Sequence, residues 1–370
     1  GGGASEAEGS TSSNSTTTPT RKEYTLIAQD AELEIAPGKV VKTWTFNGTM
    51  PGPTLRFTEG DNVTIKFINK TPIPHTVHMH GNHDAVNDGV HHQVMPNETY
   101  LYNITAGPAG ALMYHCHAYP TSLHIRMGMY GAMIVDPKDT LLPPAREFVM
   151  VLSEFDDDNI MKFETKYYPI NGYIDQYVQN PIQVNRDELV RLYVINIGTT
   201  IPYQFHLHST IFKAYPSGLL SNEPVDVQTA PVGPGDATLI EAKWKYPGTY
   251  LFHSHGFLEE RGNMGQIVVS ENINENNNNS NQAAQGNETT RSISMINWQY
   301  ELQKKLQNPT IINYTDAQLT AINGSTSDHG GMIAHDNTTT FTQLTANASG
   351  APIPEDQLSH GNSRGGVTPI

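Results

Sequence analysis

The sequence contains a single cysteine, few basic residues and no long hydrophobic stretch. With one cysteine among 370 residues, no disulfide can form within the chain. The 22 lysines and arginines stand against 37 acidic residues, a formal net charge of -15. This balance argues against nucleic acid as a partner, because such a partner requires a basic face. No run of about 18 apolar residues occurs, so we expect no transmembrane segment.

Short β-rich segments fill two consecutive regions, residues 23–144 and 145–270. The first region contains "NVTIKFIN", "TYLYNIT" and "GALMYHC", and the second contains "LVRLYVINI", "ATLIEAKW" and "TYLFHSHG". Glycine, proline and asparagine separate these segments, and none of them has helical periodicity. We therefore predict an all-β protein with two β-sandwich or barrel domains.

The two ends of the chain differ in composition from these regions. Residues 1–22 are rich in glycine, serine and threonine, which predicts a flexible N-terminal segment. Residues 271–370 begin with the polar stretch "ENINENNNNSNQ", and we expect a low-complexity linker followed by a largely irregular C-terminal extension. One short helix is expected in "ISMINWQYELQKKL". Several Asn-x-Ser/Thr sequons, together with the N-terminal segment, favour an extracytoplasmic location: periplasmic, pseudoperiplasmic or secreted.

The histidines form a repeated pattern. The first region contains "GALMYHCHAY" and "HMHG", and the second answers with "GTYLFHSHGF" and "HLHS", so the two regions are an internal repeat. Residues i and i+2 of a β-strand face the same side, so each His-x-His pair directs two imidazoles toward one point. Neutral imidazole suits copper and zinc. The four pairs are His78 and His80, His115 and His117, His206 and His208, and His253 and His255.

A second set of candidate ligands occurs only in the first region. Two histidines, a thiolate and a weak thioether ligand together make a blue-copper electron-transfer site. In the second region Tyr203 stands in the place of the first of these histidines, and Ser254 stands in the place of the cysteine. The set comprises His75, Cys116, His124 and Met129.

These motifs resemble the multicopper oxidase family, specifically its two-domain, laccase-like members. The similarity spans about residues 24–270 and includes "FNGTMPGPTLRFTEGDNVTIKFIN", "HTVHMHG", "YHCHAYPTSLHIRMGM", "FHLHS" and "FHSHG". It implies two cupredoxin domains and four coppers per chain. The type 1 copper ligands would be His75, Cys116, His124 and Met129, and the type 2 ligands His78 and His206. The type 3 pair would take His80, His115, His117, His208, His253 and His255.

The resemblance also implies an activity and an assembly. A small reducing substrate (a phenol, an aromatic amine or a small nitrogen compound such as hydroxylamine) would be oxidised while O2 is reduced to water. Each domain supplies half of a trinuclear cluster, so a homotrimer with clusters at the subunit interfaces is expected. Asp88 in "NDGV" resembles an acidic residue near the type 2 copper and is a candidate proton relay, although an Asp-Gly turn explains it equally well.

Two alternatives remain open at this point. One is an enzyme like the copper nitrite reductases, which share the two-domain, trimeric arrangement. Those enzymes have an aspartate at the position of His78 and lack the histidine found here at 117, so the residues favour oxygen as the acceptor. The other alternative is a non-catalytic copper or electron carrier. In the extension, "DHGGMIAH" offers His329, Met332 and His335 as ligands for an extra copper, or is simply a flexible surface segment.

Overall fold

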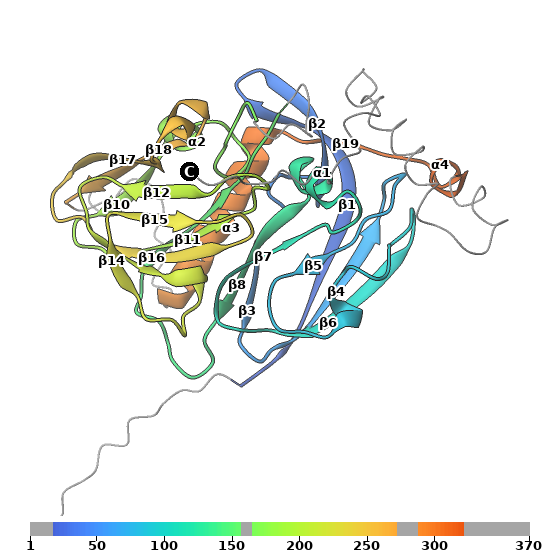
Figure 1. Cartoon of the computed structure of the whole chain (residues 1–370), viewed down its shortest axis with the longest axis horizontal. Coiled ribbons are helices and arrows are strands. Elements are labelled where there is room, and N and C mark those ends of the chain that lie inside the picture. The colour runs from blue at the N-terminus through green and yellow to red at the C-terminus, as the bar shows by residue number, and fades with distance from the viewer. Residues whose placement is uncertain (1–17, 157–164, 272–287, 322–370) are drawn as a thin grey trace, which may run out of the picture.

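Two β-sandwich domains lie next to each other, and a long helix runs between them (Figure 1). The computed structural model describes residues 18–156, 165–271 and 288–321. The all-β, two-domain fold expected from the sequence is confirmed, with the domain junction between the last strand of the first domain and Arg146. In the described ranges, no helix is long and apolar enough to span a bilayer.

The first domain packs two sheets over one core. One sheet has the order β19-β1-β4-β6 with β2 also paired to β1, and the other has the order β3-β8-β7-β5. In β4, Val63, Ile65 and Phe67 alternate into the core. The elements are β1 (Arg21–Ala36), β2 (Lys39–Phe46), β3 (Leu55–Thr58), β4 (Asn62–Asn69), β5 (His78–Met79), the 3-10 helix η1 (Ala85–Asn87), β6 (Thr99–Thr105), β7 (Gly110–His115), α1 (Thr121–Arg126) and β8 (Tyr130–Asp136).

The second domain repeats this plan. Its sheets have the orders β10-β18-β17-β12-β15 and β14-β13-β16-β11-β9, so β9 forms the edge of the second sheet. The elements are β9 (Arg146–Leu152), α2 (Gln176–Gln179), β10 (Asn180–Asn185), β11 (Val190–Asn196), β12 (Tyr203–Leu207), β13 (Phe212–Tyr215), η2 (Pro216–Gly218), β14 (Val225–Val227), β15 (Thr229–Val232), β16 (Ala237–Ala242), β17 (Gly248–Ser254), η3 (Phe257–Arg261) and β18 (Met264–Ser270).

The repeat extends to a close packing contact in each domain. In β8, a Cβ on Gly131 would lie 2.4 Å from the Tyr114 ring of β7. In β18, a Cβ on Gly265 would lie 2.1 Å from the Phe252 ring of β17. Glycine is therefore required at both places, because the aromatic ring occupies the space of a side chain. The two glycines therefore occupy corresponding positions in the two domains.

A third apolar core joins the two domains. It contains Met50, Met113 and Tyr130 from the first domain and Val149 and Ile195 from the second. Burial of these side chains from both domains means that the domain interface is packed like a protein interior. The relative position of the two domains is therefore fixed by apolar contact as well as by polar bonds.

The C-terminal extension is more regular than the sequence indicated. It forms α3 (Glu288–Gln307), β19 (Thr310–Ile312) and α4 (Asp316–Ala321), of which β19 pairs antiparallel with β1. The hydroxyl of Tyr314 donates to Asp30 Oδ2 at 2.7 Å, which ties this segment to the first domain. The short helix expected in this extension is present as part of α3, and pairing with β1 and burial against both domains stabilise regular structure over residues 288–321.

Candidate metal centres

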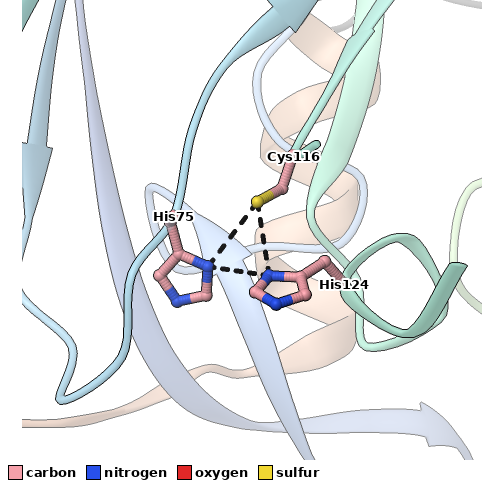
Figure 2. Close-up of side chains that lie close together, drawn as sticks. All are labelled: His75, Cys116 and His124. Carbon is pink, nitrogen blue, oxygen red and sulfur yellow. Dashed lines mark hydrogen bonds between the residues drawn. The ribbon is translucent and has the colours of Figure 1, made fainter. Parts of the chain in front are cut away.

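The side chains of His75, Cys116 and His124 converge on one point inside the first domain (Figure 2). The Nδ1 atoms of the two histidines are 3.0 Å apart, and Cys116 Sγ lies 3.7 Å from His75 Nδ1 and 3.3 Å from His124 Nδ1. His75 precedes β5, Cys116 follows β7, and His124 lies in α1. Three separate segments therefore bring two nitrogens and one sulfur together.

This set is shielded from water. All three side chains are at most 1% exposed, and the indole of Trp44 packs against both imidazoles with ring centroids 5.7 and 4.9 Å away. Burial lowers the pKa of His75 well below its usual value and lowers that of His124 to about 3. Both imidazoles are thus neutral near pH 7, which is the form that binds a metal.

Backbone hydrogen bonds position the sulfur and the fourth candidate ligand. The amide of Thr76 donates to Cys116 Sγ at 3.4 Å, while burial raises the pKa of the free thiol to about 11. Met129 is fully buried, its amide donates to His124 O at 3.2 Å, and its carbonyl accepts from Cys116 N at 3.0 Å. Met129 is therefore bonded through its backbone to two of the three converging residues.

A buried ion pair anchors α1 to the second domain. Arg126, two residues after His124, lies 3.0 Å from Glu154, with side chains 4% and 0% exposed. Glu154 also accepts from Thr199 Oγ1 at 3.1 Å and from Thr200 N at 3.0 Å. Although burial alone would raise the pKa of Glu154, the bonds from Thr200 and the charge of Arg126 outweigh it and lower the pKa.

Four more histidines gather at the end of β5 and β7. His78 and His115 are directly paired across these strands, and His80 Nε2 is 3.3 Å from His115 Nε2. The His78 ring lies 5.0 to 5.3 Å from the rings of His80, His115 and His117. Burial lowers the pKa of His80 to about 4 and that of His115 to about 3. We call these four residues the first half-site.

The second domain contains a matching arrangement, which we call the second half-site. His206 pairs with His253 across β12 and β17, and His208 Nε2 is 3.0 Å from His253 Nε2. The His206 ring lies 4.9 to 5.8 Å from the rings of His208, His253 and His255. The structure thus reproduces in each domain the same register between two His-x-His strands.

Backbone carbonyls fix the tautomer of one histidine on each of these strands. His78 Nδ1 donates to Asp88 O at 2.7 Å, and His115 Nδ1 donates to Cys116 O at 2.9 Å. In the second half-site, His206 Nδ1 donates to Gln228 O at 2.7 Å, and His253 Nδ1 donates to Ser254 O at 3.1 Å. A carbonyl only accepts, so Nδ1 carries the proton and Nε2 keeps its lone pair for a metal. This donor set fits copper.

The two half-sites do not meet within one chain. Among the described residues, no group of three converging ligand atoms and no ring contact joins a histidine of the first half-site to one of the second. In the single chain His255 is exposed, and His78, His80 and His117 are partly exposed. Each half-site therefore presents histidines at the surface of the chain.

The second domain has the same backbone arrangement as the cysteine site, but other side chains occupy the ligand positions. The amide of Gln204 donates to Ser254 Oγ at 3.0 Å, just as the amide of Thr76 donates to Cys116 Sγ. Tyr203 takes the place of His75 and donates through its hydroxyl to Ser153 O at 2.5 Å. Asn263 stands where the Gly131 and Gly265 alignment places Met129, and its Oδ1 accepts from Ser254 N at 2.7 Å. Hydrogen bonds between neutral groups thus replace the ligand set there.

The loop after β5 contributes an acidic group to the first half-site. Asp88 Oδ1 accepts from His83 Nε2 at 2.8 Å and lies 3.3 Å from His78 Nδ1. The side chain of His83 is only 5% exposed and lies beside Asp88. His91 is exposed, and His92 pairs instead with Glu98. His329, Met332 and His335 lie outside the described residues.

Comparison with known proteins agrees with this geometry. Multicopper oxidase family models match residues 28–140 and 142–273. The copper-containing nitrite reductase of Neisseria gonorrhoeae is 29% identical over 272 residues, covering 68% of this chain and 69% of that protein. Laccase-15 of Oryza sativa subsp. japonica is 33% identical over 145 residues, covering 35% of this chain and 23% of the laccase. A crystal structure of a multicopper oxidase superposes with a TM-score of 0.65 at 35% identity, covering 68% of this chain and 89% of that one. The chain belongs to the multicopper oxidase family.

Proposed function

We propose that the protein is a laccase-like oxidase that couples one-electron oxidation of a small reducing substrate to the four-electron reduction of O2 to water. The observation that carries this proposal is the pair of matching half-sites, four histidines each, beside a single cysteine-centred ligand set. Phenols, aromatic amines and small nitrogen compounds such as hydroxylamine are the donor classes to examine.

The donor atoms suggest which residues hold copper. His75, Cys116, His124 and Met129 would hold a type 1 copper, and His78 and His206 a type 2 copper. Four coppers per chain would supply one-electron transfer at the first site and storage of the four electrons that O2 requires at the others. The type 3 pair would be held by His80, His115, His117, His208, His253 and His255.

Cys116 links the two kinds of site through covalent bonds. It is bonded in sequence to His115 and His117, whose rings belong to the first half-site. The path from the Cys116 sulfur to either imidazole thus crosses one peptide bond and no solvent. This short covalent path would allow electrons to pass from the type 1 copper to the coppers of the first half-site.

The separation of the half-sites supports a proposal for the assembly. Since each chain carries two half-sites that do not meet, a complete cluster requires the first half-site of one chain to face the second half-site of another. We propose a homotrimer with three interfacial clusters, closed by rotational symmetry. The expected extracytoplasmic location is likewise a proposal, supported by the sequons and the N-terminal composition.

Asp88 is the proposed proton relay. Its carboxylate is 35% exposed, so it exchanges protons with solvent, and it touches His83 Nε2 and His78 Nδ1. A carboxylate that contacts both solvent and the surroundings of a ligand histidine is placed to pass protons inward.

Oxygen uptake by copper-loaded protein tests the proposal. Consumption of O2 with a panel of phenols, aromatic amines and hydroxylamine, together with about four coppers per chain, is the expected result. About one copper per chain and no oxygen uptake with any donor would instead indicate an electron carrier. Measuring the mass of the assembly on the same sample tests the trimer.

The nitrite reductase named among the relatives makes nitrite the second candidate acceptor. His117→Ala separates the two, because the half-site histidine at 117 is expected to be essential for oxygen reduction and dispensable for a mononuclear nitrite reductase. His92→Ala is the matched control, since His92 is 46% exposed and bonds Glu98 away from the half-site. Loss of oxygen uptake only in His117→Ala supports the oxidase; retained nitrite reduction without oxygen uptake in the unmodified protein refutes it.

A further inference from the structure

Helix α3 places a row of buried glutamines between the two domains. It lies beyond residue 273, where the second family match ends, and runs along the domain boundary (Figure 1). Gln299, Gln303 and Gln307 are 9%, 4% and 1% exposed, and their spacing of four puts them on one face of the helix. A polar stripe at such a buried position has to be satisfied by hydrogen bonds.

Two of these side chains each bond a single backbone residue twice. Val149 N donates to Gln299 Oε1 at 2.8 Å, and Gln299 Nε2 donates back to Val149 O at 3.2 Å. Met50 N donates to Gln307 Oε1 at 3.0 Å, and Gln307 Nε2 donates to Met50 O at 2.5 Å. Val149 belongs to the second domain and Met50 to the first, so one helix holds both domains by equivalent bonds.

Met50 packs against the segment that contains Met129. A Cβ on Gly128, whose φ is +120°, would be 3.0 Å from Met50 Sδ and 2.8 Å from Trp44 O. Two residues after Met50, the amide of Gly52 donates to Tyr130 O at 2.7 Å. The Met50 segment therefore contacts the residues on both sides of Met129.

The second domain also contacts Met50, through the backbone of Gly172. A Cβ on Gly172 would lie 2.1 Å from Met50 O and 3.0 Å from Gln307 Nε2. The Met50 carbonyl is thus enclosed by Gln307 and by the Gly172 backbone. Because there is so little free space around the Met50 carbonyl, a change of the Gln307 side chain is expected to displace Met50.

We infer that Gln307 is a positioning residue for the type 1 copper, acting through Met50 on residues 128–130 and so on Met129. The inference rests on the proposed function, in which Met129 is the weak axial ligand. The axial ligand tunes the potential of such a site, so a change in its position has a spectroscopic and electrochemical signature. Gln307 bonds Met50 and is not one of the four candidate type 1 ligands.

Gln307→Met and Gln299→Met form a matched pair of variants. Each replaces a buried glutamine of the same helix by a side chain of similar volume and removes two bonds to one backbone residue; Gln299→Met also removes the bond from Gln299 Nε2 to the Tyr177 hydroxyl. We expect Gln307→Met to shift the visible absorption, the electron paramagnetic resonance spectrum and the reduction potential of the type 1 copper. Gln299→Met is expected to leave all three unchanged while lowering thermal stability to a similar degree.

The outcomes separate the inference from the proposed function. If the unmodified copper-loaded protein lacks a type 1 spectrum, the proposed function fails and the inference with it. If that spectrum is present and neither variant changes it, or both change it equally, only the inference is overturned. Should Gln307→Met not fold, Gln307→Asn is the second variant. In copper-free protein it should speed amide exchange at residues 128–130 relative to Gln299→Asn, and equal exchange in the two refutes the inference.

Discussion

Replacing Arg126 by methionine tests the coupling between α1, which carries His124, and the second domain. The Arg126 and Glu154 side chains are 4% and 0% exposed, so the variant leaves a carboxylate buried without its cation. Removing one partner of a buried pair costs about 3–5 kcal/mol. Because Thr199 and Thr200 still donate to Glu154, we expect the lower end, about 3 kcal/mol.

Chemical denaturation of the copper-free protein at pH 7 measures this loss, and pH adds an internal check. The pKa of Glu154 is lowered in the folded chain, so its contribution to stability is present above its usual pKa of 4.5 and is lost as the pH falls through the folded value. The difference between unmodified protein and Arg126→Met should therefore shrink toward acid pH, as the unpaired carboxylate takes up a proton.

Arg186→Met is the control with the same substitution at the surface. Arg186 is 45% exposed and pairs with Glu271, which is 61% exposed, so its loss should cost less than about 1 kcal/mol. Equal losses for the two variants, or a loss at Arg126 that stays constant as the pH is lowered, would contradict the argument from burial.

Three further changes have distinct expected results. Cys116→Ser should abolish the blue colour and turnover and lower the copper content from about four to about three per chain, measured by absorption and metal analysis. Burial raises the pKa of Asp30 to about 6, and the hydrogen bond from Tyr314 lowers this pKa by a smaller amount. The contribution of Asp30 to stability is therefore present below its usual pKa of 3.8 and is lost as the pH rises through about 6. Asp30→Asn should thus be more stable than the unmodified protein at pH 7, by about 2–3 kcal/mol in denaturant unfolding, and unchanged stability would argue against this sign. Asp88→Asn should slow steady-state oxygen consumption while copper content and type 1 absorption stay normal; a normal rate would exclude the proton relay.

The cysteine site and both half-sites were predictable in outline from the sequence. Alternation along a strand places His115 and His117 on one side, and the repeat relates them to His253 and His255. The strand register, which pairs His78 with His115, depends on tertiary packing and is not encoded by any local pattern. The same is true of Arg126, because its partner Glu154 lies in the other domain.

Helix α3 shows where pattern reasoning fails. Its buried face is made partly of glutamine, a residue type that usually faces solvent, so the distribution of apolar residues does not identify that face. Only the positions of Val149 and Met50, fixed by the rest of the fold, explain why glutamines are buried there. The sequence therefore predicted a short helix and underestimated the order of residues 288–321.

The bonds between Gln299 and Val149 lie on β9, the edge strand of its sheet. Since β9 ends its sheet, the polar groups along its outer side are available for pairing with a strand of another molecule. Gln299 occupies Val149 N and O, and Asn171 accepts from Val151 N at 2.8 Å and also donates to Val149 O. Side-chain amides thus act in place of a neighbouring strand and protect this edge from pairing with a strand of another molecule.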